Sequence, residues 1–197
     1  MARRVVIALL TPVSWAPPGT STEHWRRALA EDMVDLVASL AAADAAIASG
    51  PDDANLAAAV AWPRMPIYPA TTARAALERA AADGYDQAAV LAGDAPDLPG
   101  LLVGKLLQPL GTRQAAVSPS RNGGLIGVAS RLPVPEWFPD LDLDEAAAVD
   151  VRAAAPRRAL VAETPGWHRL RGPADLARLD PALDGWDTTR ALLSGGG

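Results

Sequence analysis

Residues 86–100, DQAAVLAGDAPDLPG, join a short apolar run to a loop that holds two acids and two prolines. The apolar run, residues 87–92, lies between the turn-forming glycines Gly84 and Gly93, which is typical of a strand covered on both faces of a parallel sheet. Its carboxyl end falls at Gly93 and Asp94. Because open α/β sheets bind ligands beyond the carboxyl ends of their strands, we predict a ligand site here.

Asp94 and Asp97 are the candidate catalytic residues of this loop. A carboxylate at a strand end can hold a divalent metal, a ribose hydroxyl or a water, so Asp94 is also the candidate metal ligand. The alternative for Asp94 is a plain turn aspartate. Asp97, two residues before Pro99, either acts in the site or caps the helix that Pro99 opens.

Composition excludes several classes of protein. The net charge of −5 and the absence of a concentrated basic face argue against a nucleic-acid partner. There is no cysteine, and two histidines, His24 and His168, are too few for a histidine-rich zinc site. The first apolar run, residues 5–10, is too short for a signal peptide, and no run approaches the roughly 18 apolar residues of a membrane span. We therefore expect a cytoplasmic protein without a membrane partner.

Apolar runs alternate with helical patterns of about a dozen residues along one expected domain, residues 1–193, followed by a flexible tail, residues 194–197. This order predicts a three-layer α/β/α sandwich with a mostly parallel sheet. The expected strands cover residues 4–10, 44–49, 65–68, 87–92, 114–118, 125–129 and 157–161. We expect Leu10, Ser49 and Ala92 to end neighbouring strands at a common crevice.

Asn122, Gly123 and Gly124 separate two of these strands and suit a tight turn with positive φ. The turn predicts a hairpin, which would add one antiparallel strand pair to the mostly parallel sheet. A loop that lets backbone amides approach a ligand is equally compatible with these residues.

Three segments carry a resemblance to a known fold: VLAGDAPDLPG at residues 90–100, SPSRNGGLIG at residues 118–127 and GPADLARL at residues 172–179. They resemble the nucleotide-diphospho-sugar transferase fold, which includes GT-A glycosyltransferases and nucleotidyltransferases such as molybdenum cofactor guanylyltransferase and phospholactate guanylyltransferase. Among these, the segments resemble most the uncharacterised GT-A-like family DUF2064. VLAGDAPDLPG, residues 90–100, is similar to the family's G-D-x-P-x-L-P loop. SPSRNGGLIG, residues 118–127, is similar to its P-x-x-D-G-G segment, and GPADLARL, residues 172–179, to its T-P-x-D-L-x-x-L helix start.

The resemblance implies a transferase that binds a nucleotide or a nucleotide sugar across the ends of the first and fourth strands. It implies that Asp94 binds Mg²⁺ or Mn²⁺ or a ribose hydroxyl. The transfer reaction would then proceed without a covalent intermediate. The nucleotide would contact the first loop and the turn between the fifth and sixth strands. These candidate contacts are Thr11, Ser14, Gly19, Asn122, Gly123 and Gly124.

The sequence also departs from the family pattern. The family's first loop carries a lysine and an arginine for phosphates, whereas residues 11–22, TPVSWAPPGTST, hold no basic residue, and Lys105 is the only lysine of the chain. Asn122 replaces the family's aspartate, and Arg169 and Arg171 stand where the pattern D-V-D-T-P has acids. Two guanidiniums there would repel a divalent cation and attract a phosphate or another anionic small molecule. Alternatively, they are exposed positions of an edge strand.

Two functional interpretations follow. The first is a nucleotide-dependent transferase with a diverged site. The second is an inactive family member that binds a nucleotide or an anionic metabolite, or acts as a partner subunit.

Overall fold

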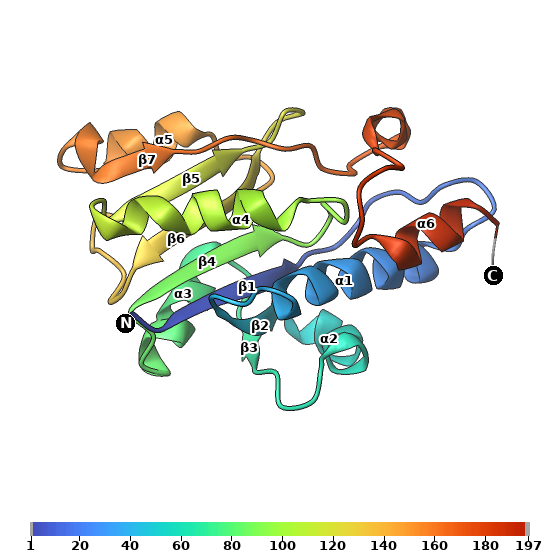
Figure 1. The fold of residues 1–197 in the computed structure, drawn as a ribbon, viewed down its shortest axis with the longest axis horizontal. Helices are drawn as coiled ribbons and strands as arrows, with labels where there is room; N and C mark the ends of the chain where they lie inside the picture. Colours follow the sequence, from blue (N-terminus) through green and yellow to red (C-terminus); the bar gives the residue numbers. More distant parts are fainter. Residues whose placement is uncertain (1, 196–197) are drawn as a thin grey trace.

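The computed structural model describes residues 2–195, and its centre is a seven-stranded sheet in the order β3-β2-β1-β4-β6-β5-β7 (Figure 1). Within these described residues, β6 is the only strand that runs antiparallel to its neighbours, β4 and β5. The mostly parallel sheet with one antiparallel hairpin is therefore confirmed. The strands are β1 (Arg4–Leu10), β2 (Asp44–Ser49), β3 (Ile67–Pro69), β4 (Gln87–Ala92), β5 (Ala115–Pro119), β6 (Leu125–Arg131) and β7 (Val161–Glu163).

Helices cover both faces of the sheet, which confirms the three-layer α/β/α architecture. Helices α1, α2 and α4 pack on one face, and α3 and α5 pack on the other. The α-helices are α1 (Thr22–Ala38), α2 (Ala54–Val60), α3 (Ala73–Ala82), α4 (Gly100–Leu107), α5 (Ala148–Ala154) and α6 (Asp187–Leu193), and the 3₁₀ turns are η1 (Pro51–Asp53), η2 (Gln108–Gly111), η3 (Arg158–Leu160) and η4 (Pro173–Arg178).

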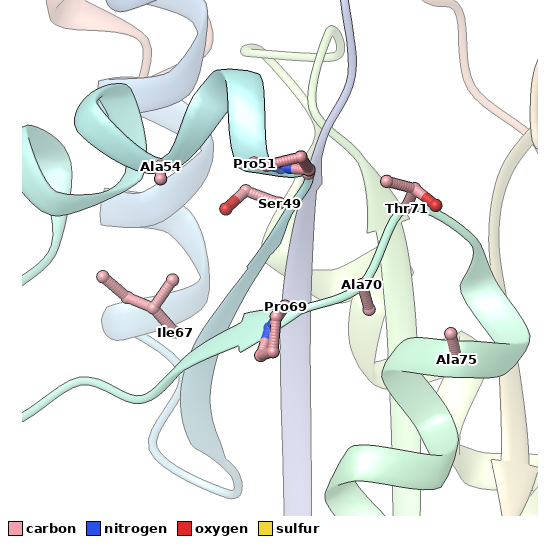
Figure 2. Close-up of a pocket in the computed structure, with 9 residues that line it drawn as sticks. Ser49, Pro51, Ala54, Ile67, Pro69, Ala70, Thr71 and Ala75 are labelled. Carbon is pink, nitrogen blue, oxygen red and sulfur yellow. The ribbon is translucent and has the colours of Figure 1, made fainter.

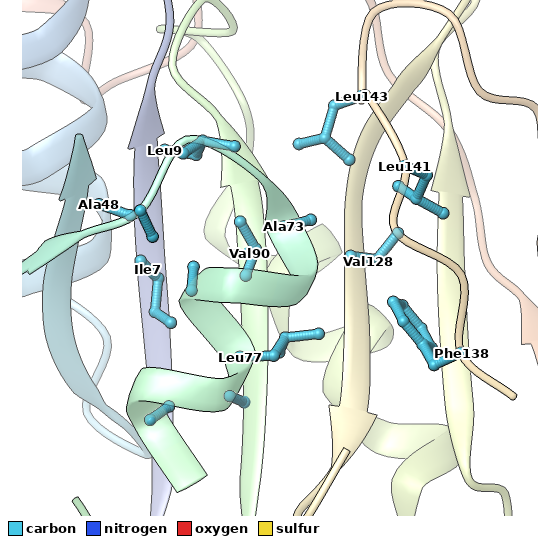
Figure 3. Close-up of a cluster of buried hydrophobic side chains, with 14 of the residues drawn as sticks. Ile7, Leu9, Ala48, Ala73, Leu77, Val90, Val128, Phe138, Leu141 and Leu143 are labelled. Carbon is cyan, nitrogen blue, oxygen red and sulfur yellow. The ribbon is translucent and has the colours of Figure 1, made fainter. Parts of the chain in front are cut away.

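The central strands are buried on both faces, as their continuous apolar sequences predict. Successive side chains of a strand point to opposite faces. Ile7 and Leu9 therefore join the cluster under α3 (Figure 3), whereas Val6 and Ala8 join the cluster under α1. Phe138 and its neighbours extend the first cluster over β6. The two clusters hold the strand ends in fixed relative positions.

Four strands differ in their bounds from the prediction. The strand expected over residues 114–118 forms at Ala115–Pro119, and the one expected over residues 125–129 extends to Arg131. The larger differences are at the two edges of the sheet. The strand expected over residues 65–68 forms at Ile67–Pro69, and the one expected over residues 157–161 begins only at Val161. In the second case residues 158–160 form the turn η3, which uses the backbone amide of Val161 to close on Arg158. Both strands are short edge segments at which local turns compete with pairing.

The chain after β7 passes along the strand ends and returns to α1, where α6 docks (Figure 1). Asp32 of α1, which is 2% exposed, accepts hydrogen bonds from Thr188 N at 3.0 Å and Thr189 N at 2.8 Å. Burial raises the pKa of Asp32, although these hydrogen bonds act in the opposite direction. Residues 196–197 of the predicted flexible tail lie outside the described residues. No helix within residues 2–195 is long and apolar enough to cross a bilayer.

Candidate functional site

The carboxyl ends of β1, β2 and β4 meet at one edge of the sheet. Leu10 pairs with Ser49, and Leu9 pairs with Ala92, as expected for neighbouring parallel strands. Asp94 follows β4 and lies beside the first loop, where Thr11 lines the same cavity. That cavity measures only about 10 Å³, which is room for about one water molecule.

The first loop closes this part of the crevice because its apolar side chains pack against the C-terminal segment. The Trp15 ring lies 5.3 Å from the ring of buried Trp25, and Trp15 Nε1 donates to Leu170 O at 3.1 Å. Of the three loop residues predicted to contact a nucleotide, only Thr11 lies at the strand ends beside Asp94; Ser14 and Gly19 are exposed further along the loop. The loop therefore acts as a cover over the ends of β1 and β4.

Asp94 is bound to Arg169, which is 1% exposed. Arg169 Nε donates to Asp94 Oδ1 at 2.5 Å, and Nη2 donates to Asp94 Oδ2 at 2.9 Å. The same Nη2 atom donates to Asp144 Oδ1 at 2.5 Å. This bidentate, charge-assisted geometry is the strong form of an arginine–carboxylate pair.

The remaining donors of Arg169 are also occupied. Its Nη1 atom donates to Leu125 O at 3.3 Å and to Leu143 O at 3.0 Å, so all five N–H groups of the guanidinium have acceptors. Burial alone would lower the pKa of Arg169, but the charges and hydrogen bonds of Asp94 and Asp144 outweigh it and raise the pKa. The guanidinium is a permanent internal cation.

These contacts correct what the sequence predicted for the two arginines. The exposed edge-strand alternative is wrong for Arg169, and this side chain has no donor left for a phosphate. Arg171 is exposed, and its Nη1 atom donates to Asp144 O at 3.0 Å. Arg171 therefore remains the candidate for direct contact with an anion.

The turn between β5 and β6 has the predicted geometry, because Gly123 and Gly124 have φ angles of 94° and 76°. The side chain of Asn122 holds the backbone of Arg169: Nδ2 donates to Arg169 O at 2.8 Å, and Oδ1 accepts from Arg169 N at 3.2 Å. The side-chain amide of Asn122 thus pairs with both backbone groups of Arg169, as the backbone of a neighbouring strand would, and it positions Arg169.

Asp97 does not cap α4, whose N-cap is Pro99 without a side-chain hydrogen bond. It is 1% exposed, its Oδ1 accepts from Trp167 Nε1 at 3.1 Å, and its Oδ2 lies 3.0 Å from His168 Nε2. The His168 ring stacks on Trp167 with centroids 4.9 Å apart. Asp97 therefore anchors the segment that carries Arg169, and these neighbours shield it from the crevice.

Two charged residues of this region had not been identified from the sequence. Asp144 lies in an irregular stretch with no periodic signal. Arg26 is on the polar face of α1, yet it lines both the small cavity beside Asp94 and a pocket of about 400 Å³ over η1, where it forms an ion pair with Asp53. In the sequence, Arg26 could have been identified from its position in the first turns of the helix that follows the first loop.

An open pocket of about 370 Å³ lies beyond the carboxyl ends of β2 and β3 (Figure 2). Its walls are mainly apolar, and the hydroxyl-bearing side chains Ser49 and Thr71 stand on two sides of it. A Cβ atom on Gly50 would lie 2.9 Å from Thr71 Cγ2, so glycine lets these sides approach. The lining residues are Ser49, Gly50, Pro51, Ala54, Ile67, Pro69, Ala70, Thr71 and Ala75.

The divalent metal that the family resemblance implies does not fit the residues present. Both carboxylate oxygens of Asp94 are bonded to Arg169. Across residues 2–195, no three histidine, cysteine, aspartate or glutamate side chains are grouped so that they could hold a metal ion.

The structure is similar over its full length to solved structures of transferases. A protein from Desulfovibrio desulfuricans G20, assigned as a nucleotide-diphospho-sugar transferase, matches with a TM-score of 0.66 at 20% identity, over 100% of this chain and 99% of that chain. A 4-diphosphocytidyl-2C-methyl-D-erythritol synthase from Anaerococcus prevotii DSM 20548 matches with a TM-score of 0.61 at 11% identity, over 98% and 96% of the two chains.

Glucosyl-3-phosphoglycerate synthase from Mycobacterium tuberculosis, solved with Mg²⁺ and uridine diphosphate, matches with a TM-score of 0.58 at 15% identity. The match covers 99% of this chain and 79% of that chain. No protein-family model matches the sequence, and no curated protein matches it either. At these identities the likeness establishes the fold.

Proposed function

We propose, from its GT-A-like nucleotide-diphospho-sugar transferase fold, that this chain binds a nucleotide or a nucleotide sugar and serves a transferase-type reaction. The observation that carries the proposal is the open pocket of about 370 Å³ beyond β2 and β3. Parallel sheets bind ligands at this edge, and apolar walls with a few polar groups are typical of small-molecule sites. Such a pocket suits the base and ribose of a nucleoside.

Arg26 is the proposed contact for the phosphates, since the first loop carries no basic side chain. It lies between the cavity beside Asp94 and the pocket over η1, and its Nε atom is buried without a hydrogen-bond partner among the described residues. The Arg26 side chain as a whole is 25% exposed and lines the pocket over η1, where a ligand phosphate would gain a charge-assisted hydrogen bond with the guanidinium. Arg26 would thus replace part of the family's phosphate clamp.

Blocking the pocket is expected to weaken nucleotide binding. In the Ala54→Trp variant, the indole occupies the space proposed for the base, and we expect the affinity for uridine or cytidine nucleotides to fall at least about tenfold. Isothermal titration calorimetry with a panel of nucleoside diphosphates and nucleotide sugars measures the change. Ala58→Trp is the control, because Ala58 is exposed on the same helix outside the pocket. Equal affinities of the two variants for a ligand that binds wild type would place the site elsewhere.

Anion binding by Arg171 is a separate prediction. Replacing Arg171 by alanine should weaken nucleotide binding about two- to fivefold at low salt and flatten its salt dependence, because exposed charges are screened over about 8 Å at physiological ionic strength. Titrations at several salt concentrations, with EDTA and then with Mg²⁺, measure both effects. Arg157→Ala, an exposed arginine beside η3, is the matched loss of charge. Binding that needs Mg²⁺ and ignores Arg171 would contradict the prediction.

Binding without group transfer is the second candidate function. It is favoured by the salt bridge between Asp94 and Arg169, because the carboxylate at the end of β4 is already neutralised. The transfer of a sugar or a nucleotidyl group to an acceptor distinguishes the two candidates. A chain that binds nucleotide but forms no product with any acceptor class would be a binding subunit.

A further inference from the structure

All five hydrogen bonds of the Arg169 guanidinium go to oxygen atoms. Three are carboxylate oxygens, Asp94 Oδ1, Asp94 Oδ2 and Asp144 Oδ1, at 2.5, 2.9 and 2.5 Å from its nitrogens. Two are the backbone oxygens of Leu125 and Leu143, at 3.3 and 3.0 Å. We refer to these five oxygens as the oxygen cage. Carboxylate and carbonyl oxygens are the donor set that hard divalent cations such as Ca²⁺, Mg²⁺ and Mn²⁺ prefer.

The position of Arg169 Nη2, inside the cage, lies within hydrogen-bond distance of both Asp94 and Asp144. The Nη2 atom of Arg169 contacts Asp94 and Asp144 simultaneously, so the two carboxylates converge on one position although they are 50 residues apart in the sequence. Asp94 is 8% exposed, and Arg169 is 1% exposed. Two carboxylates this close are mutually repulsive unless a cation lies between them.

We infer that Arg169 is a built-in cation that takes the place of a divalent metal ion in this cage. It neutralises Asp94 and Asp144 permanently, and a metal ion could enter only by displacing a side chain that makes five hydrogen bonds. Removal of the guanidinium then converts the oxygen cage into a divalent-cation site. The inference concerns the cage alone and stands whether or not the proposed nucleotide site is correct.

The test compares cation binding by wild type and by Arg169→Ala. Wild type should bind no Mn²⁺ by electron paramagnetic resonance at millimolar concentration, and its melting temperature should be the same in EDTA and in Mn²⁺. Arg169→Ala should melt lower in EDTA, and saturating Mn²⁺ or Ca²⁺ should raise its melting temperature by about 5 °C or more. The triple variant Arg169→Ala/Asp94→Asn/Asp144→Asn removes the cage charges and should lose the response to cations.

Arg169→Lys keeps one positive charge in the cage and should fold without acquiring Mn²⁺ binding. If Arg169→Ala fails to fold in EDTA, refolding in Mn²⁺ or Ca²⁺ supports the inference, and failure to fold in these cations contradicts it. A folded Arg169→Ala variant that ignores divalent cations also overturns the inference. So does Mn²⁺ binding by wild type that disappears in Asp94→Asn.

Discussion

The Asp94→Asn variant is expected to lose about 3–5 kcal/mol of the free energy of unfolding, because it leaves the buried guanidinium of Arg169 without its main counter-charge. Neutralising an exposed loop carboxylate would cost little stability. The bidentate bond from Arg169, which is 1% exposed, is the reason for the larger value. Urea denaturation of the two proteins measures the difference.

Asp140→Asn is the matched control, because Asp140 is an exposed loop carboxylate, and it should change the stability by no more than about 0.5 kcal/mol. A double-mutant cycle with Arg169→Met isolates the coupling of the pair, since residues in direct contact do not behave additively. A loss below about 1 kcal/mol for Asp94→Asn, or no coupling in the cycle, would show that the pair contributes little.

Gly124→Ala is expected to destabilise the protein by about 2–5 kcal/mol, combining backbone strain with a steric clash. Gly124 has a φ of 76°, and a Cβ atom there would lie 2.5 Å from Leu143 O and 2.7 Å from Asp144 O. These atoms belong to the segment that contacts Arg169 and Arg171. The clash would therefore also displace one side of the oxygen cage.

Gly123→Ala separates the two effects. Gly123 also has a positive φ, 94°, but no atom lies within 4 Å of the position of its Cβ, so only the backbone strain of about 1–2 kcal/mol applies. Chemical denaturation of both variants gives the difference. Equal losses of stability in the two variants would mean that residues 143 and 144 move away from Gly124 at no cost in free energy.

Local pattern was sufficient to predict the architecture. The run at residues 87–92 is apolar after Gln87 and ends at glycine, so both the burial of β4 on two faces and its carboxyl end follow from the sequence. The hairpin also followed, because Asn122 and the two glycines after it permit only a narrow set of turns. The edge strands β3 and β7 were less well placed, since each pairs over only three residues.

The sequence predicted where the candidate site lies, but not which partners its residues have or how deeply they are buried. The end of β4 identifies Asp94, whereas its partner lies 75 residues later, and nothing local to Arg169 indicates burial. Asp144 belongs to an irregular stretch without periodicity. The sequence interpretation of the first loop rested on its lack of a basic side chain. In the structure, Trp15 of this loop packs on Trp25 and closes the crevice.

The dependence of Asp94 on a distant arginine has a consequence during synthesis on the ribosome. The strands β1 to β4 emerge first and can pair with one another through local crossovers, but at that stage Asp94 and Asp97 have no partners. Arg169, Trp167 and His168 leave the ribosome late, and only then do both acids meet these partners. We therefore expect nascent chains that end before residue 167 to remain protease-sensitive at the loop after β4, and chains that include residues 167–193 to become resistant.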